Sequence, residues 1–411
     1  MAHVVGESAM AFAYRALPGR VRFGWGASAD HLVEELEAAG ATRILLVHAE
    51  AERELAERLA RPLGDAVVGT FTDVRQHVPV DVAHAGRRAA AASGADWILS
   101  VGGGSTTGAA KAIALEAGVQ IAAVPTTYAG SEMTPVWGMT EDGVKQTGRD
   151  MRVLPSLVVY DPELTTSLPA AVTGPSAFNA MAHCVASYTA PGANPITALV
   201  ADEGIRALSA GVVRATHDPF GREGRELLLY GAHLAGSAFA VAGSGLHHRI
   251  CHVLGGRYDL PHAATHTVML PQVLAFNEPA TPGVATRIRF AVSAGLETFS
   301  AGAGQAVFEL IESVGGPLSL AEIGMPRAQL RAVAESVIAG LRADNPRPVS
   351  VGDVVSILEA AYDGVKPAAY HEAHGRLTQG ADGTGAAARA GDDRRDDTKG
   401  LTDPARPVER G

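Results

Sequence analysis

Short apolar runs alternate with helical periodicity along the first 165 residues. Runs typical of buried strands lie at 43–48, 66–71, 97–105 (where the strand ends in a glycine turn) and 121–125. Between them, apolar residues recur every three or four positions and predict helices at 50–60, 81–93 and 107–118. This alternation predicts a parallel sheet with helices on both faces, with flanking strands at 21–26 and 157–162.

The pattern changes near residues 160–169. Long segments rich in Ala, Leu and Val follow, without a convincing strand, at 169–190, 195–214, 224–243, 263–276, 284–296, 303–314, 327–341 and 351–363. We therefore expect an α/β domain at 1–165 and an all-helical domain at 166–365. Residues 372–411 are rich in Gly, Asp and Arg and nearly free of large apolar side chains, so we expect a disordered tail.

Composition and charge limit the classes of partner that the chain is expected to bind. The chain is 47% hydrophobic and 19% charged, with a formal net charge of −10. This balance argues against nucleic acid as a partner, although a local cationic pocket could still bind a small anion. Two cysteines, Cys184 and Cys251, make no disulfide framework. Without a signal peptide or an apolar run of membrane-spanning length, the sequence predicts a cytoplasmic protein with no membrane partner.

Two strand ends carry small and hydroxyl-bearing residues. In SVGGGSTTGAAK (100–111), a strand ends in three glycines and a serine where a helix begins. Backbone N–H groups at a helix N-terminus can hold a pyrophosphate. The same residues could also form a tight strand-to-helix turn that binds no ligand. In VPTTYAGSEMT (124–134), hydroxyl groups follow the neighbouring strand. Ligands of open α/β sheets bind beyond such strand ends.

Histidines gather in GLHHRICHVLGGRYDLPHAATH (245–266), five in 22 residues. His248 and His252 share a helix face, and His262 follows a turn. On an earlier helix, Asn179 and His183 also share a face. These side chains could form a transition-metal site, a proton-transfer site or a cluster of core histidines.

These motifs resemble the iron-containing alcohol dehydrogenase superfamily over residues 15–365. The resemblance rests on Gly102–Ser105, the Pro125–Thr127 loop, the Asn179/His183 pair and His248/His262 with His252 between them. It implies an N-terminal Rossmann-like domain, a C-terminal helical domain, an active site in the cleft between them, and a homodimer.

Within the superfamily the chain is most similar to the maleylacetate reductase branch, through GGGSTTGAAKAIAL, PTTYAGSEMT, GLHHRICHVLGG, YDLPHAATH and LAEIGMP. The resemblance implies reduction of the C=C bond of 2-maleylacetate, a small dicarboxylate, by NADH or NADPH. Two positions depart from the wider family: Asn179 and Gly108 each stand where Asp is usual. An amide binds divalent cations poorly, so we expect no metal. Ala49, where NAD-specific relatives tend to have Asp, favours tolerance of NADPH beside NADH.

The expected chemistry is hydride addition to the carbon β to a ketone, giving an enolate that hydrogen-bond donors stabilise and an acid protonates. We expect His248 and His262 to be the main donors, with His183, His252 and Asn179 completing the pocket and His247 and His266 structural. The expected cofactor contacts are Gly102, Gly103, Gly104, Ser105, Thr126, Thr127, Tyr128, Ser131 and Lys145. Arg149 and Arg249 are candidates for binding substrate.

Two other interpretations remain at this point. The chain could be a metal-dependent alcohol or glycerol dehydrogenase of the same superfamily, which Asn179 argues against. It could also be a nicotinamide nucleotide sensor without catalysis, which the retained histidines argue against.

Overall fold

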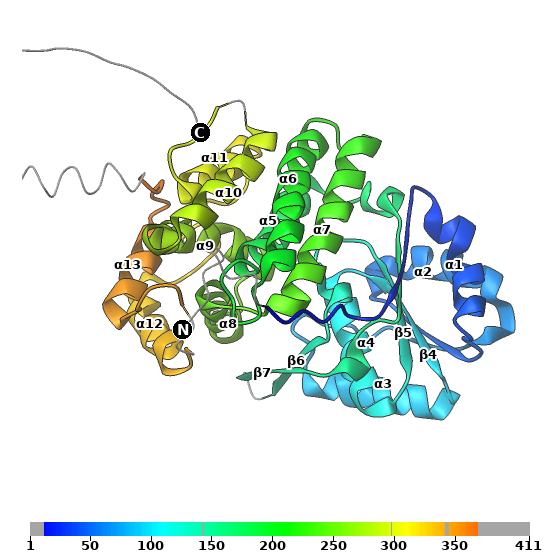
Figure 1. Cartoon of the computed structure of the whole chain (residues 1–411). Coiled ribbons are helices and arrows are strands. Elements are labelled where there is room, and N and C mark those ends of the chain that lie inside the picture. Colours follow the sequence, from blue (N-terminus) through cyan, green and yellow to red (C-terminus); the bar gives the residue numbers. More distant parts are fainter. Residues whose placement is uncertain (1–11, 142–143, 297, 342–344, 369–411) are drawn as a thin grey trace, which may run out of the picture. The chain divides into compact units, whose positions relative to one another are not determined.

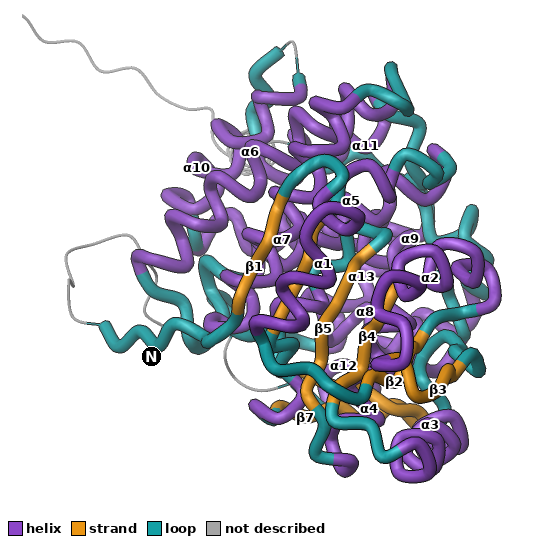
Figure 2. Tube along the Cα trace, turned by 90° about the vertical axis from the view of Figure 1, so that its right-hand side faces the viewer, coloured by secondary structure: helices purple, strands orange, loops and turns teal. Residues whose placement is uncertain are grey.

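Strands and helices alternate in the first half of the chain, as the sequence pattern predicts. The computed structural model describes residues 12–141, 144–296, 298–341 and 345–368. A parallel sheet of six strands has the order β1-β8-β5-β4-β2-β3, and Figure 2 shows most of these strands side by side. The strands are β1 (Arg20–Phe23), β2 (Ile44–Val47), β3 (Val67–Phe71), β4 (Trp97–Gly102), β5 (Gln120–Pro125) and β8 (Leu157–Tyr160).

Helices cover both faces of this sheet because its strands alternate apolar side chains between two buried sides. Leu46, Leu99 and Val124 pack with α1 (Ala27–Ala38) and α2 (Arg53–Ala60). Their neighbours Leu45 and Ile98 pack instead with α3 (Val80–Ser93) and α4 (Gly104–Ala117). We call residues 12–165 the sheet half.

Helices alone build the rest of the described chain, residues 166–368, which we call the helical half (Figure 1). They are α5 (Ala170–Ala186), α6 (Pro195–His217), α7 (Arg222–Ala242), α8 (Leu246–Tyr258), α9 (His262–Asn277), α10 (Pro282–Val292), α11 (Ala303–Ser313), α12 (Leu330–Ala339) and α13 (Val351–Tyr362). One large core joins side chains of α5–α7 and α9–α11 to Ala123 on β5 and Val158 on β8. The helical half therefore packs directly on the sheet, which fixes the two halves against each other at β5 and β8.

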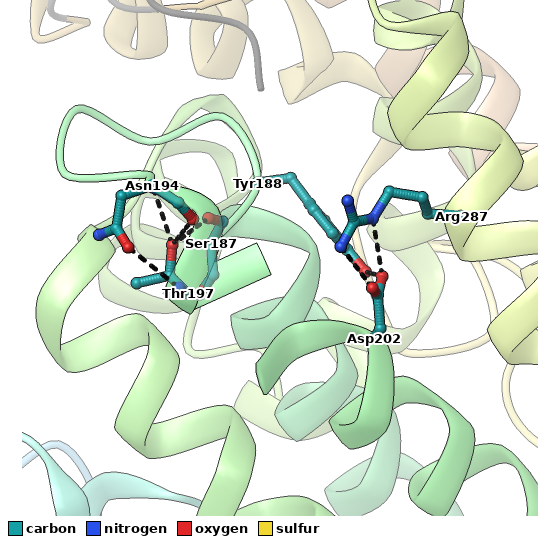
Figure 3. A network of polar contacts seen from close by, with 6 residues as sticks. All are labelled: Ser187, Tyr188, Asn194, Thr197, Asp202 and Arg287. Atoms are coloured by element: carbon teal, nitrogen blue, oxygen red, sulfur yellow. Dashed lines mark hydrogen bonds and ion pairs between the residues drawn. The ribbon is translucent and has the colours of Figure 1, made fainter. Parts of the chain in front are cut away.

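Polar contacts fix the start of α6 within this helical half (Figure 3). Asn194 caps the helix by accepting hydrogen bonds from the backbone N–H groups of Ile196 and Thr197. Further along, Asp202 accepts a hydrogen bond of 2.6 Å from the Tyr188 hydroxyl and pairs with Arg287 of α10. These contacts join the segment that follows α5 to α6 and α10.

The predicted fold class is confirmed, with α/β and all-helical regions in the expected order. Two elements were not predicted: helix α1, and the antiparallel hairpin of β6 (Val136–Glu141) and β7 (Val144–Arg149). The hairpin strands are polar or only half-buried, so they give no clear apolar run. The domain boundaries stay a prediction, because residues up to Tyr370 form one compact unit. The predicted disordered tail, 372–411, lies outside the described residues.

Within the described ranges, each helix taken singly is too short or too polar to cross a bilayer, and only α7 and α8 together reach that length and composition, across a bend of 103°.

Candidate functional site

A cavity of about 450 Å³ lies between the two halves. The sheet half contributes the start of α4, the loop after β5, the hairpin and the β3–α3 loop, and the helical half contributes α5 and α7–α9. The polar side chains at the cavity wall are Gln76, His77, Ser105, Lys111, Thr127, Ser131, Thr134, Thr147, Ser176, Asn179, His183, Ser244, His248, His252 and His262. The cavity therefore brings the predicted glycine turn and the predicted histidines to one place.

The glycine turn forms the N-terminus of α4. Gly103 precedes the helix, and no side chain caps its first N–H groups. Gly102 has φ of 149°, and a Cβ there would lie 2.4 Å from Thr106 Oγ1. A Cβ on Gly103 would lie 2.9 Å from Thr127 Cγ2. Glycine is therefore required here by both conformation and space, and the open helix N-terminus can receive an anion.

The loop after β5 divides into residues that reach the cavity and residues that do not. Thr127 and Ser131 line the cavity, whereas Thr126 is buried behind it. Tyr128 is fully buried, and its hydroxyl group donates to Thr165 Oγ1 and accepts from Arg225. The expectation that Tyr128 contacts the cofactor is therefore corrected: its ring anchors the loop to the helical half because Thr165 and Arg225 satisfy its hydroxyl group.

Lys111 was missed by sequence reasoning. It is fully buried on α4, and its Nζ donates to Ser131 O at 2.5 Å, Thr134 Oγ1 at 3.0 Å and Val136 O at 3.0 Å. Burial lowers the pKa of Lys111 to about 7, against the opposing pull of the Glu132 carboxyl. The sequence signal was a lysine among the small apolar residues of GAAKAIAL, where a charge can only be buried with partners.

Histidine rings line the opposite wall of the cavity. His183 of α5 stacks on His248 of α8, with ring centroids 5.3 Å apart and planes 15° apart. Phe239 of α7 contacts both rings, at 4.5 Å from His183 and 4.8 Å from His248. His252 lies one turn further along α8, with its centroid 6.3 Å from that of His248, and His262 begins α9. We call His183, His248, His252 and His262 the histidine wall.

Several polar atoms at this wall are buried without a hydrogen-bond partner among the described residues. They are Asn179 Oδ1, His183 Nδ1 and both ring nitrogens of His248. Buried polar atoms without partners are costly, so such a cluster is typical of a ligand-binding site. His252 and His262 are only half-buried, which gives them some contact with solvent.

Burial keeps the inner histidines neutral. It lowers the pKa of His183 to about 4, with a further contribution from the positive charge of Lys111. It lowers the pKa of His248 well below its usual value, and the neighbouring histidines act in the same direction. Each ring therefore carries one N–H at neutral pH and acts there as a neutral hydrogen-bond donor.

A second layer lies behind the histidine wall. His247 Nε2 and His266 Nδ1 are hydrogen-bonded at 3.0 Å, and Cys251 Sγ lies 3.7 Å from His247 Nε2. Within the described ranges these three residues form the one histidine, cysteine and carboxylate group compact enough to hold a metal ion. Their mutual hydrogen bonds account for the arrangement, in keeping with the structural role expected of His247 and His266.

The iron ion that the family's name implies fits this site poorly. The position of a carboxylate ligand is taken by Asn179, whose amide oxygen is neutral and a weak ligand. The histidine wall does not bring three ligand atoms within 4.8 Å of one another in the described structure. His183 and His248 instead stack face to face, an arrangement stabilised by Phe239.

The predicted cationic residues do not gather at the cavity. Arg249 turns to α12, where it donates to the backbone oxygens of Ser336 at 2.9 Å and Val337 at 3.4 Å. Arg149, at the end of β7, is also absent from the described cavity wall. Arg249 is thus held by helix carbonyls, which contradicts the expectation that it binds substrate, whereas the same expectation for Arg149 stays a prediction. Lys145 pairs with Thr140 in the hairpin, and its side chain lies outside the described part of the structure.

Fold and site together define the class of protein. The family model of iron-containing alcohol dehydrogenases matches residues 18–162, and the family model of their C-terminal region matches residues 173–362. The chain therefore belongs to the iron-containing alcohol dehydrogenase family.

Comparison with individual proteins shows which members of this family the chain is similar to. The chain is 45% identical over 357 residues to maleylacetate reductase of Burkholderia cepacia, covering 87% of this chain and 99% of that one. It is similar to the crystal structure of maleylacetate reductase from Agrobacterium tumefaciens, with a TM-score of 0.82 and 40% identity, covering 87% and 100% of the two chains. A structure of 1,3-propanediol oxidoreductase has a TM-score of 0.78 at 27% identity, covering 86% and 100%.

Proposed function

We propose that this protein reduces the C=C bond of 2-maleylacetate to give 3-oxoadipate, with NADH or NADPH and without a metal ion. The observation that carries the proposal is the pair of buried, neutral rings of His183 and His248, in which His183 Nδ1 and both ring nitrogens of His248 lack hydrogen-bond partners among the described residues, facing an open helix N-terminus across one cavity. The identity to relatives named maleylacetate reductase supports the choice of substrate.

The sheet half binds and orients the cofactor in this proposal. The N-terminus of α4 and the hydroxyl groups of Thr127 and Ser131 receive the phosphates and riboses. A bound reduced nicotinamide supplies the hydride. Use of either cofactor is favoured because Ala49 has no carboxylate, and because Glu50 is held by Arg53 through contacts of 2.8 and 2.6 Å. The charge of Glu50 is therefore paired with Arg53, which reduces its repulsion of a 2′-phosphate at this strand end.

The histidine wall handles the electrons and the proton. Hydride adds to the carbon β to the ketone, and the electron pair of the C=C bond moves toward the ketone oxygen, giving an enolate. His248 donates a hydrogen bond to this oxygen, which a neutral imidazole can do without first losing a proton. His262, which retains solvent contact at the start of α9, then protonates the carbon α to the ketone and takes up a proton from solvent in its place. His183, His252 and Asn179 shape the pocket around these two donors.

The conjugation of the substrate makes a metal dispensable. A simple ketone needs strong polarisation before hydride attacks it, and a metal ion supplies that. An enone spreads the developing charge over a conjugated system, so neutral hydrogen-bond donors suffice. We also propose a cytoplasmic homodimer, as the family resemblance implies.

The test is an assay of NADH and NADPH oxidation with freshly prepared maleylacetate. We expect one nicotinamide to be oxidised for each maleylacetate, with 3-oxoadipate identified by mass spectrometry. Oxidation of 1,3-propanediol that depends on added iron, with no turnover of maleylacetate, would instead identify a metal-dependent alcohol dehydrogenase. Binding of NADH without any turnover would identify a nucleotide sensor.

A further inference from the structure

One face of α5 presents three polar side chains to the cavity. Ser176, Asn179 and His183 stand at positions i, i+3 and i+7, so they share a face of the helix. Each is more than nine-tenths buried, and all three line the cavity. The residues between them are apolar or Cys, and they pack in the large core of the helical half. The polar face of α5 therefore borders the space that a ligand can occupy.

Asn179 is the middle member of this row, and its amide has hydrogen-bonding capacity left over. Its Oδ1 atom is buried without a hydrogen-bond partner among the described residues. An amide has two N–H donors and one acceptor, and leaving such groups unpaired in a buried place costs free energy. A buried polar group of this kind is explained where a ligand completes its hydrogen bonds.

Ser176 lies one turn from Asn179, beside the loop after β5. Its Oγ atom accepts a hydrogen bond of 3.0 Å from the backbone N–H of Tyr128 in that loop. This contact fixes the oxygen and leaves the hydroxyl hydrogen to donate. Thr127, the preceding residue of the loop, lines the same cavity. The row on α5 thus extends from the histidine wall, at His183, to the side of the cavity that we expect to hold the cofactor.

The charges around the cavity favour an anion at this face. Among the described side chains of the cavity wall there is neither an arginine nor a carboxylate, and Lys111 alone has an ammonium group. That ammonium donates to oxygens of Ser131, Thr134 and Val136, so its hydrogens are already used. Its field still reaches α5, because burial lowers the pKa of His183 and the charge of Lys111 adds to that shift. Neutral donors in a positive field suit a carboxylate.

We propose that Asn179 and Ser176 bind the substrate carboxylate that is attached to the C=C bond, with the amide and the hydroxyl group each donating one hydrogen bond. This proposal rests on the proposed function and deepens it by naming two specificity-determining residues. Hydride adds to the carbon that bears this carboxylate, and only the two carbons of the double bond separate it from the ketone. Asn179 lies one helical turn, about 6 Å, from His183, which stacks on His248. The substrate can therefore reach Asn179 while its ketone oxygen accepts from His248.

The amide at position 179 also changes which charge the site accepts. A carboxylate there would repel a substrate dianion unless a cation lay between them. In a relative that holds iron, the ion would be that cation. An amide removes the repulsion and supplies a donor, so this single residue converts a ligand for a cation into a ligand for an anion.

The experiment compares three substrates, with chelator present throughout. Maleylacetate carries both carboxylates, cis-4-oxopent-2-enoate keeps only the one on the C=C bond, and (Z)-3-oxohex-4-enoate keeps only the remote one. Asn179→Ala should raise the KM for the first two about tenfold to a hundredfold, as expected for loss of one hydrogen bond to a charged group. The KM for (Z)-3-oxohex-4-enoate, or its inhibition constant where turnover is slow, and the KM for NADH should stay unchanged.

Further variants separate binding from structure. Asn179→Asp should raise the same two KM values at least about a hundredfold, because the new carboxylate repels the substrate. Asn179→Ser keeps a side-chain donor and should recover part of the affinity. Ser176→Ala removes the second donor and should raise the two values about tenfold. Gln329→Glu, an exposed amide-to-acid change just before α12, is the matched control and should change none of these constants.

Equal rises for all three substrates, or an unchanged KM for maleylacetate in Asn179→Ala, would overturn the assignment. A rise confined to the two substrates that carry the remote carboxylate would overturn it as well. If Asn179→Asp does not fold, the same criteria apply to Asn179→Ala and Ser176→Ala. Failure of the wild-type protein to turn over maleylacetate would refute the proposed function, whereas normal wild-type turnover with equal rises in the variants would refute only the roles of Asn179 and Ser176.

Discussion

The two walls of the cavity are built from different chemical groups. The sheet half presents backbone N–H groups, glycines and hydroxyl groups at the start of α4 and after β5. The helical half presents imidazole rings on α5, α8 and α9, and those of His183 and His248 pack against Phe239. The first wall suits a ligand with many phosphate and ribose oxygens, and it works through shape. The second suits a small reacting group, and it works through the protonation state that burial imposes.

The largest effect should come from the histidine wall. His248→Ala removes the donor to the enolate oxygen and should lower kcat by roughly a hundredfold to a thousandfold, the usual cost of one such donor. The KM for NADH should change little, because the cofactor contacts lie on the other wall. His248→Asn keeps a neutral N–H donor and should recover part of the rate. Steady-state kinetics with both substrates varied checks this, and a near-normal kcat for His248→Ala would contradict the mechanism.

A smaller effect should come from the sheet half, and on a different parameter. Gly102→Ala places a methyl group against Thr106 at an unfavourable φ, so the turn must shift. We expect the KM for NADH to rise about tenfold, the size of one lost phosphate hydrogen bond, with a modest change in kcat. Gly118→Ala is the matched control at the other end of α4, because it has a positive φ of 70° but open space around its Cβ. It should lower the thermal midpoint while the KM for NADH stays the same.

At the position where the wider family has an aspartate that binds metal, this chain has Asn179. Asn179→Asp restores the carboxylate and should tighten the binding of Zn²⁺ or Fe²⁺ at least about tenfold over the wild-type protein. Isothermal titration with the metal-free protein measures this, with Asn179→Ala as the control that lacks both groups. Equal affinity in the wild type and Asn179→Asp would show that the geometry of the histidine wall, and not the missing charge, excludes the metal.

The smallest effect is a pH dependence of stability. Burial gives Lys111 a pKa of about 7 in the folded state, below its usual 10.5. Between these values the unfolded chain binds more protons, so the contribution of Lys111 to the unfolding free energy rises with pH across that window. Lys111→Met should remove the rise. Urea unfolding at pH 7, 8 and 9 measures the difference between the two proteins, which should grow with pH. Parallel profiles would contradict the assigned burial of the charge.

The sequence predicted the histidine wall more completely than the opposite wall of the cavity, because Asn179 and the four histidines all line the cavity. Of the nine expected cofactor contacts, four line it: Gly104, Ser105, Thr127 and Ser131. A strand followed by glycines and a helix is a local pattern, and its geometry follows from the residues themselves, as Gly102 and Gly103 show. Tyr128 sits in an equally local motif, yet its ring turns into the core because Thr165 and Arg225 lie there. Arg249 likewise lies within the histidine stretch, but helix carbonyls of α12 take its guanidinium.

The β3–α3 loop could not be predicted because its shape depends on contacts distant in the sequence. The backbone oxygen of His77 accepts a hydrogen bond from Thr140, and Val78 fits into the space that Gly108 leaves. The protonation state of His248 could not be predicted from the sequence either, because it depends on burial by Phe239 and His183. Spacing placed these histidines together, and only the packing shows that the inner rings are neutral.

One measurement on the wild-type protein tests most directly whether catalysis proceeds without a metal ion. The protein is chelated exhaustively, its residual metal is determined by mass spectrometry, and maleylacetate-dependent NADH oxidation is followed before and after. We predict an unchanged kcat with far less than one metal ion per chain. Loss of activity on chelation, restored by added Fe²⁺ or Zn²⁺, would show that the histidine wall does not work without a metal.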